Sequence, residues 1–215
     1  LMNHLNQIAP LIEIFNQKDL LTQENLNALI AVDDIKKIAK AIIRLDKAGI
    51  LNQDNFNAIM VNDAVDAKTI VKALNYLNQA GILNSENRNA IFNSRKHVLK
   101  IVKAIADLNN EGILNQDNFI ALTMNNGANA DRIAQAIIYL NRAGILNAEN
   151  RDTVANRGEN ALTIGEAIIR LDRAGILNPE NRKAIANSGV NAWSINKVIN
   201  HLHQAGILNQ NNFTI

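Results

Sequence analysis

The chain has 215 residues, with 22 basic side chains, 20 acidic side chains and no cysteine. The formal charge of +2 neither requires nor excludes a polyanionic partner, and the lack of cysteine excludes disulfides, thiolate metal sites and a cysteine nucleophile. Hydrophobic residues make up 47% of the sequence and aromatic residues only 4%, which predicts a core that is aliphatic throughout. The sequence has no apolar run of membrane-spanning length and no signal-peptide layout, so we expect a soluble protein in a reducing intracellular compartment.

A short motif returns along the whole chain at intervals of about 31 residues, which is the period of a helical repeat array. Residues 49–55 read Gly-Ile-Leu-Asn-Gln-Asp-Asn, and residues 19–25 contain a degenerate copy. Later copies begin at Gly81, Gly112, Gly144, Gly175 and Gly206. The spacing predicts an all-α solenoid, a superhelix of about six tandem two-helix repeats.

The repeat at residues 51–82 illustrates the predicted unit. Asn52 is a favourable N-cap, and Asn55, three residues later, is placed to complete a capping box, so a short helix begins here and fades near residues 62–63. A longer amphipathic helix follows, with apolar residues at the i, i+3, i+4, i+7 spacing that includes Leu77. Gly81 then ends this helix through a left-handed C-cap.

The same pattern divides the rest of the chain. Residues 1–20 correspond to the long helix of a preceding repeat, and residues 208–215 begin a further one. Complete repeats cover residues 21–50, 51–82, 83–113, 114–145, 146–176 and 177–207. Because arrays normally need polar caps, we expect flanking segments beyond both ends.

The loop between the two helices of each repeat varies, whereas the long helix does not. Eleven residues separate the second-helix isoleucine from the following glycine in each case, as from Ile70 to Gly81. The loops differ in length and composition, so they are candidates for recognition. The alternative is that these surface positions simply drift.

Residues 178–189 read Asn-Pro-Glu-Asn-Arg-Lys-Ala-Ile-Ala-Asn-Ser-Gly, and two long helices end in Asn-Gln-Ala-Gly (78–81) and His-Gln-Ala-Gly (203–206). These stretches resemble the repeats of transcription-activator-like (TAL) effectors and their bacterial relatives. The resemblance covers the whole chain at low stringency. It implies a superhelix that follows the major groove of double-stranded DNA and reads one base pair per repeat through the inter-helix loops.

The resemblance also implies which residues face the DNA. The implied base-reading pairs are Asn62 and Asp63, Ser94 and Arg95, Asn125 and Asn126, Arg157 and Gly158, and Ser188 and Gly189. Aspartate can accept from cytosine, Asn or Arg can bond a purine, and Gly leaves room for a thymine methyl. Lys68, Lys96 and Arg132 are candidates for the phosphate side, although backbone N–H groups would carry most phosphate contact, with modest salt dependence.

Two other functions stay open. A monomeric α-solenoid can hold a protein partner on its concave face, as bacterial effectors do, and repeat arrays can also bind single-stranded RNA. RNA is disfavoured because the loops lack aromatic side chains that stack on bases. We expect no catalysis, cofactor or metal site, and Trp193 is expected to pack against the next helix. The family resemblance places the protein in a host nucleus or a bacterial cytoplasm.

Overall fold

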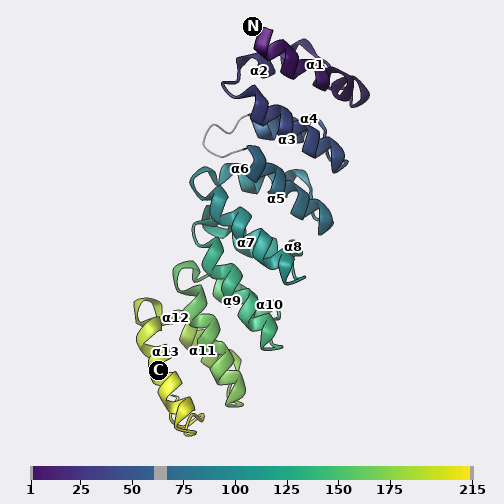
Figure 1. The fold of residues 1–215 in the computed structure, drawn as a ribbon. Helices are drawn as coiled ribbons and strands as arrows, with labels where there is room; N and C mark the ends of the chain where they lie inside the picture. Colours follow the sequence, from purple (N-terminus) through teal and green to yellow (C-terminus); the bar gives the residue numbers. More distant parts are fainter. Residues whose placement is uncertain (1, 61–66, 214–215) are drawn as a thin grey trace. The chain divides into compact units, whose positions relative to one another are not determined.

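The computed structural model of the chain describes residues 2–60 and 67–213, and helices are the only regular secondary structure in this part. Short helices of eight or nine residues alternate with long helices of thirteen residues after the N-terminal helix α1 (Figure 1). The long helices are α1 (Met2–Gln17), α3 (Ile35–Lys47), α5 (Ala67–Gln79), α7 (Val98–Asn110), α9 (Ala130–Arg142), α11 (Ala161–Arg173) and α13 (Ala192–Gln204). The short helices are α2 (Gln23–Ala31), α4 (Gln53–Met60), α6 (Ser85–Asn93), α8 (Gln116–Thr123), α10 (Ala148–Ala155) and α12 (Pro179–Asn187). The predicted helical class and the alternation are confirmed.

Each short helix begins at a polar cap, as predicted. The side chain of Asn52 accepts a hydrogen bond from the backbone N–H of Asn55 at 2.9 Å, and Thr22, Asn84, Asn115, Asn147 and Asn178 do the same in the other short helices. An acidic residue lies in the first turn of every one of these helices, where the helix dipole favours negative charge. These local interactions define where each repeat starts.

The third residue of each short helix differs from the prediction. Asn55 does not complete a capping box with the backbone N–H of the cap. Its side-chain Nδ2 instead reaches the carbonyl oxygen of Ile50, five residues earlier, at 2.6 Å. The equivalent bonds join Asn25 to Leu20, Asn87 to Ile82, Asn118 to Ile113, Asn150 to Ile145 and Asn181 to Ile176. We call the short segment between the end of a long helix and the next short helix, such as residues 48–52 between α3 and α4, the joint between two repeats. The buried amides hydrogen-bond this joint to the start of the short helix.

The long helices end at glycines in the left-handed region. At Gly81, φ is 70°, its N–H donates to Asn78, and the N–H of Ile82 donates to the carbonyl of Leu77 at 2.9 Å. This is the Schellman pattern, which satisfies carbonyls that a helix end leaves free. Asp19 takes the glycine position after α1 and has a φ of 54°. The predicted C-caps are confirmed.

The structure contains two compact units, residues 1–102 and residues 103–215. In the first unit α3 packs between α1 and α5, and in the second α11 packs between α9 and α13. Leu77 and Leu140 are fully buried, which confirms their predicted place in the core. The prediction of a core that is aliphatic throughout is wrong, because Phe15, Phe56 and Phe119 are among the largest fully buried side chains.

Helix α13 is less buried than its sequence pattern predicts. Val198 belongs to its apolar stripe but is 57% exposed. In the described chain, α13 packs on α11 and α12, and no further helix follows it. The apolar stripe of a repeat helix is buried partly by its neighbours in the array, so this side of α13 stays open.

Candidate nucleic-acid interface

Four of the inter-helix loops contain a short 3-10 turn just before the long helix, with two residues between the turn and the helix in the case of α9. In the described residues these turns are Arg95–His97, Met124–Gly127, Gly158–Asn160 and Gly189–Asn191. The variable residues therefore lie in these turns or one residue before them, close to the N-terminus of a long helix. Backbone N–H groups at such a terminus favour an anionic ligand.

The loop of the repeat at residues 114–145 presents its two variable side chains to solvent. Asn125 and Asn126 are exposed and adopt φ values of 51° and 55°. Two consecutive left-handed residues other than glycine are unusual, and asparagine is among the few side chains that tolerate this conformation. Gly127 follows with a φ of 71° and is buried. The loop projects two amides that can each donate and accept hydrogen bonds.

The next loop is arranged differently. Gly158 is buried, and a Cβ at this position would lie 2.6 Å from Nδ2 of Asn129 in the preceding repeat. Only glycine fits there without movement of Asn129. Arg157 is exposed, but its guanidinium donates to Oδ1 of Asn187 in the next repeat at 2.9 Å. This pair therefore joins three successive repeats.

The two serines of the implied pairs bond within their own helices. The hydroxyl of Ser94 is buried and donates to the carbonyl of Ala90, and that of Ser188 donates to the carbonyl of Ile185, both at 2.6 Å. Gly189 is exposed with a φ of 53°. Asn62, Asp63 and the side chain of Arg95 lie outside the described part of the structure.

Hydrogen bonds connect the loops of successive repeats in the second unit. Arg132, at the start of α9, donates to the carbonyl oxygen of Glu159 at 2.6 Å. Asn160 donates to the carbonyl oxygen of Gly189 at 3.0 Å, and Arg157 bonds Asn187 as described above. The three loops are thus tied into one row at the same end of neighbouring helices.

The proposed phosphate-side residues fall into two groups. Lys68 and Lys96 are exposed near the starts of α5 and α7. Arg132 is also exposed, but its guanidinium already donates to the Glu159 carbonyl. This bond gives Arg132 a structural role that the sequence did not suggest.

An ion pair links the C-terminal ends of α7 and α9. Arg142 of α9 pairs with Glu111 at the end of α7, and its Nε lies 3.2 Å from Glu111 Oε2. The hydrogen bond from Arg142 lowers the pKa of Glu111 below its ordinary value, and the same bond raises the pKa of Arg142. At the start of α3, the hydrogen bond from the Lys37 side chain lowers the pKa of Asp34.

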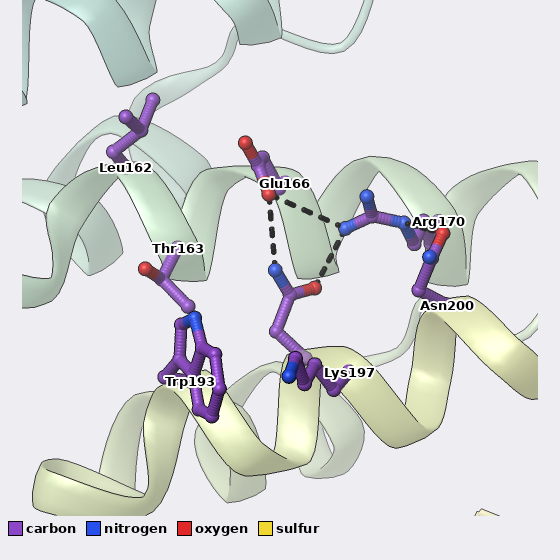
Figure 2. A pocket seen from close by; sticks show the side chains of 8 residues that line it. Leu162, Thr163, Glu166, Arg170, Trp193, Lys197 and Asn200 are labelled. Atoms are coloured by element: carbon purple, nitrogen blue, oxygen red, sulfur yellow. Dashed lines mark hydrogen bonds and ion pairs between the residues drawn. The ribbon is translucent and has the colours of Figure 1, made fainter.

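A groove with a volume of about 320 Å³ lies between α11 and α13 (Figure 2). Trp193 stands at this groove and is 61% exposed. No helix follows α13 in the described chain, so the predicted packing of Trp193 against a next helix stays a prediction. The ammonium of Lys197 lies 3.8 Å from its ring centroid, a cation–π contact that sequence reasoning missed although a spacing of four residues permits it.

The polar side chains of this groove bond mainly to one another. Asn196 donates to Glu166 at 3.0 Å and accepts from Arg170 at 2.6 Å, and Arg170 also donates to Asn200 (Figure 2). This network joins α11 to α13. The network engages Glu166, Arg170, Asn196 and Asn200, whereas the indole of Trp193 stays 61% exposed.

No cluster of three or more His, Cys, Asp or Glu side chains that could hold a metal ion occurs within residues 2–60 and 67–213. None of the helices in this part is both long enough and apolar enough to cross a membrane. Comparison of the sequence with models of known protein families and with curated proteins finds no match. The resemblance to TAL effector repeats therefore rests on the motifs themselves.

Proposed function

We propose that the chain is an α-solenoid of about six two-helix repeats that binds double-stranded DNA through its inter-helix loops. In this proposal the joints and helices hold the loops, and the exposed loop side chains contact base edges. The chain itself contributes binding and no catalysis.

The row of hydrogen-bonded loops in the second unit is the observation that carries the proposal. Bonds from Arg132 to Glu159 and from Asn160 to Gly189 fix each loop relative to the next one. Loops that follow one another at the same end of successive long helices can each contact a successive unit of a regular polymer, and duplex DNA is such a polymer. Helix N-termini beside each loop add a favourable site for phosphate.

Asn125 and Asn126 are the strongest candidates for base contact. Both are exposed, and both adopt the left-handed backbone conformation. An asparagine amide can pair with the N6 and N7 atoms of adenine in the major groove. By contrast, Arg157 and Ser188 make hydrogen bonds inside the protein, so we assign them to holding the loops.

A selection from randomised duplexes tests this function. Wild-type protein is expected to enrich a motif, and Asn126→Asp is expected to change the preferred base at one position from a purine toward cytosine, since a carboxylate only accepts hydrogen bonds. Asn110→Asp, on the exposed side of α7 away from the loops, is the matched control. Absence of any motif, or one that Asn126→Asp leaves unchanged, contradicts the proposal.

The exposed indole of Trp193 favours a second candidate function, which is binding of a protein partner at the α11–α13 groove. Tryptophan is enriched among the residues that dominate the free energy of protein interfaces, and Leu162 lines the same groove. A partner captured by the wild type and lost in Trp193→Ala, without any duplex-DNA binding, would favour this function.

A further inference from the structure

The asparagines that precede two of the long helices do not cap their own helices. Asn129 and Asn160 occupy the N-cap positions of α9 and α11, but neither side chain accepts a hydrogen bond from its helix. Asparagine is favoured at this position because its side-chain oxygen usually accepts such a bond. Asp34, at the start of α3, behaves in this usual way and accepts from the N–H of Lys37 at 3.1 Å. Asn129 and Asn160, which we call the cap asparagines, contact the next loop instead.

Each cap asparagine contacts the glycine of the following loop. Nδ2 of Asn160 donates to the carbonyl oxygen of Gly189 at 3.0 Å. Nδ2 of Asn129 lies so close to Gly158 that a Cβ on this glycine would be 2.6 Å from it. Gly158 and Gly189 are equivalent residues of successive repeats, and their φ values are 37° and 53°. An asparagine-to-glycine contact between repeats therefore occurs twice in succession, once through packing and once through a hydrogen bond.

The burial of the equivalent asparagines agrees with this contact. Asn129 and Asn160 are half-buried, whereas Asn191, at the N-cap of α13, is exposed. The side chain of Asn191 also makes no bond to its own helix, and no further inter-helix loop follows it in the described chain. The loop of the next repeat is thus what covers a cap asparagine.

The two glycines depend on an outside contact more than other residues would. Glycine has no Cβ and populates left-handed and right-handed backbone conformations about equally, so its loop keeps more conformational freedom. Gly158 and Gly189 are also members of the implied base-reading pairs. A loop with glycine at the reading position presents its backbone to a ligand, and the position of this backbone sets the space that is left for a base.

The hydrogen bonds to the backbone of these loops run in one direction along the chain. Arg132 donates to the carbonyl oxygen of Glu159 at 2.6 Å, beside Gly158, and Asn160 donates to that of Gly189. In both cases the donor is a side chain of the earlier repeat and the acceptor is a backbone carbonyl of the later one. Side chains of one repeat therefore constrain the backbone of the next loop.

We propose that Asn129 and Asn160 are positioning residues, which fix the glycine of the next loop and make base preference at one step depend on the preceding repeat. This inference rests on the proposed function and deepens it, because the cap asparagines belong to no base-reading pair. A change in a cap asparagine acts on the next base pair through the glycine. Since coupling between two sites is reciprocal, a base held at the second loop also favours its bonded state with the first.

A randomised-duplex selection with Asn160→Ala tests this coupling. Gly189→Asn identifies the motif position that the last loop reads, because it changes this loop directly. Asn160→Ala should reduce the preference for the selected base at the same position by about 2- to 10-fold, the range expected for the loss of one hydrogen bond, and more than at any other position. Asn191→Ala is the matched control, because it removes the same side chain from an equivalent, exposed place. The control should keep the wild-type motif.

A second measurement needs no DNA and tests the contact between Asn129 and Gly158. Gly158→Ala should lower the urea midpoint of unfolding, partly because the added Cβ meets Asn129. The same substitution in an Asn129→Ala background should lower the midpoint by less, since alanine leaves room for the Cβ. Equal losses in the two backgrounds would show that Asn129 does not constrain the glycine and would overturn the inference.

The outcomes of the selection separate this inference from the proposed function. If Gly189→Asn changes one motif position but Asn160→Ala leaves it unchanged, or weakens all positions equally, the coupling is wrong and base reading stands. The coupling is also wrong if Asn191→Ala has the same effect as Asn160→Ala. If the wild type selects no motif, or Gly189→Asn changes no position, base reading through this loop is wrong and so is the coupling of base preferences. A change at the same position in Gly189→Asn and Asn160→Ala supports both.

Discussion

Single residues at the joints between repeats contribute to stability through backbone conformation and through buried amides. Gly144 adopts a φ of 76° with nothing within 4 Å of where a Cβ would lie. Its role is therefore conformational and not steric. Asp19 occupies the same position after α1 and adopts a φ of 54° with a side chain that is less suited to it.

These two residues predict substitutions of opposite sign. Gly144→Ala should reduce the free energy of unfolding by about 1 kcal/mol, because alanine is strained in the left-handed region. Asp19→Gly should increase it by about 0.5–1 kcal/mol, since it removes strain and also an acid from a helix C-terminus. Urea denaturation of both variants measures these effects. A loss of stability in Asp19→Gly would contradict the assignment of Asp19 to the glycine position.

The buried asparagine at the third position of a short helix predicts a larger effect than the exposed cap. Asn118 is 1% exposed and donates to the Ile113 carbonyl at 2.8 Å. Asn118→Ala should cost about 1–3 kcal/mol, because it leaves a backbone carbonyl without its partner, whereas Asn115→Ala should cost about 1 kcal/mol. Asn110→Ala, an exposed substitution, is the control. Equal midpoints for Asn118→Ala and Asn110→Ala in urea would refute the role of the buried amide.

At the scale of helices, the buried asparagines also connect one short helix to the next. Gln53 exchanges two hydrogen bonds with Asn25, at 2.9 and 3.0 Å. Arg88 donates to Asn55 at 3.2 Å, and its second nitrogen pairs with Asp54 at 2.9 Å. Gln210 bonds Asn181 in the first manner and Arg182 bonds Asn150 in the second. Two different side chains therefore perform the same connection.

We call the Gln or Arg side chain that bonds the buried asparagine of another short helix the connector. The sequence of each short helix shows which of the two connectors it uses. Where the first position is Gln, the fourth is apolar; where the first position is another residue, the fourth is Arg. The Gln forms are Gln23 with Leu26, Gln53 with Phe56, Gln116 with Phe119, and Gln210 with Phe213. The Arg forms are Ser85 with Arg88, Ala148 with Arg151, and Pro179 with Arg182. We interpret the pattern as two interchangeable solutions to one packing problem.

This interpretation predicts a rescue. Arg88→Ala should cost about 1–3 kcal/mol, because Asn55 loses a donor in a buried position. Ser85→Gln combined with Arg88→Phe should recover most of that loss by installing the other connector. Chemical denaturation of the wild type, of Arg88→Ala and of the double variant measures the free energy of unfolding of each. A double variant as unstable as Arg88→Ala would show that the connectors are not interchangeable.

The ion pair between α7 and α9 predicts a pH dependence. The pKa of Glu111 is lowered from 4.5 by the hydrogen bond from Arg142, so the folded state binds this proton less readily than the unfolded state. The stabilisation is present above the unfolded pKa and is lost as the pH falls through the folded pKa. Wild type should therefore lose more stability than Glu111→Gln between pH 6 and pH 3. Identical thermal melting profiles across this range would contradict the contribution of this pair.

For the molecule as a whole, sequence periodicity predicted the alternation of short and long helices, the asparagine caps and the glycine joints. These features depend on residues close together in the chain. Sequence reasoning missed the contacts between repeats, such as Arg157 with Asn187, because pairs about 30 residues apart form only when helices stack. It also missed the cation–π contact of Trp193 with Lys197, because a spacing of four residues permits such a contact without requiring it.

The candidate site was predictable only in part. The position of the loops followed from the fixed length of the long helices, and the exposure of Asn125 and Asn126 agrees with a recognition role. The engagement of Arg132 with Glu159 and the burial of Gly158 depend on the packing of loops against one another. Under the proposed function, we therefore expect base contact from the loops whose variable side chains are exposed.

The measurement that tests base reading most directly is a randomised-duplex selection after a loop transplant. Ser188→Asn with Gly189→Asn copies the Asn125–Asn126 pair two repeats further along. A Cβ on Gly189 would meet nothing within 4 Å, and asparagine tolerates the φ of 53° at this position. If each repeat reads one base pair, the selected motif should gain a second copy of the Asn126-dependent base two positions away from the first. A motif that is unchanged at that position, in a variant that folds and binds like the wild type, would contradict recognition through the loops.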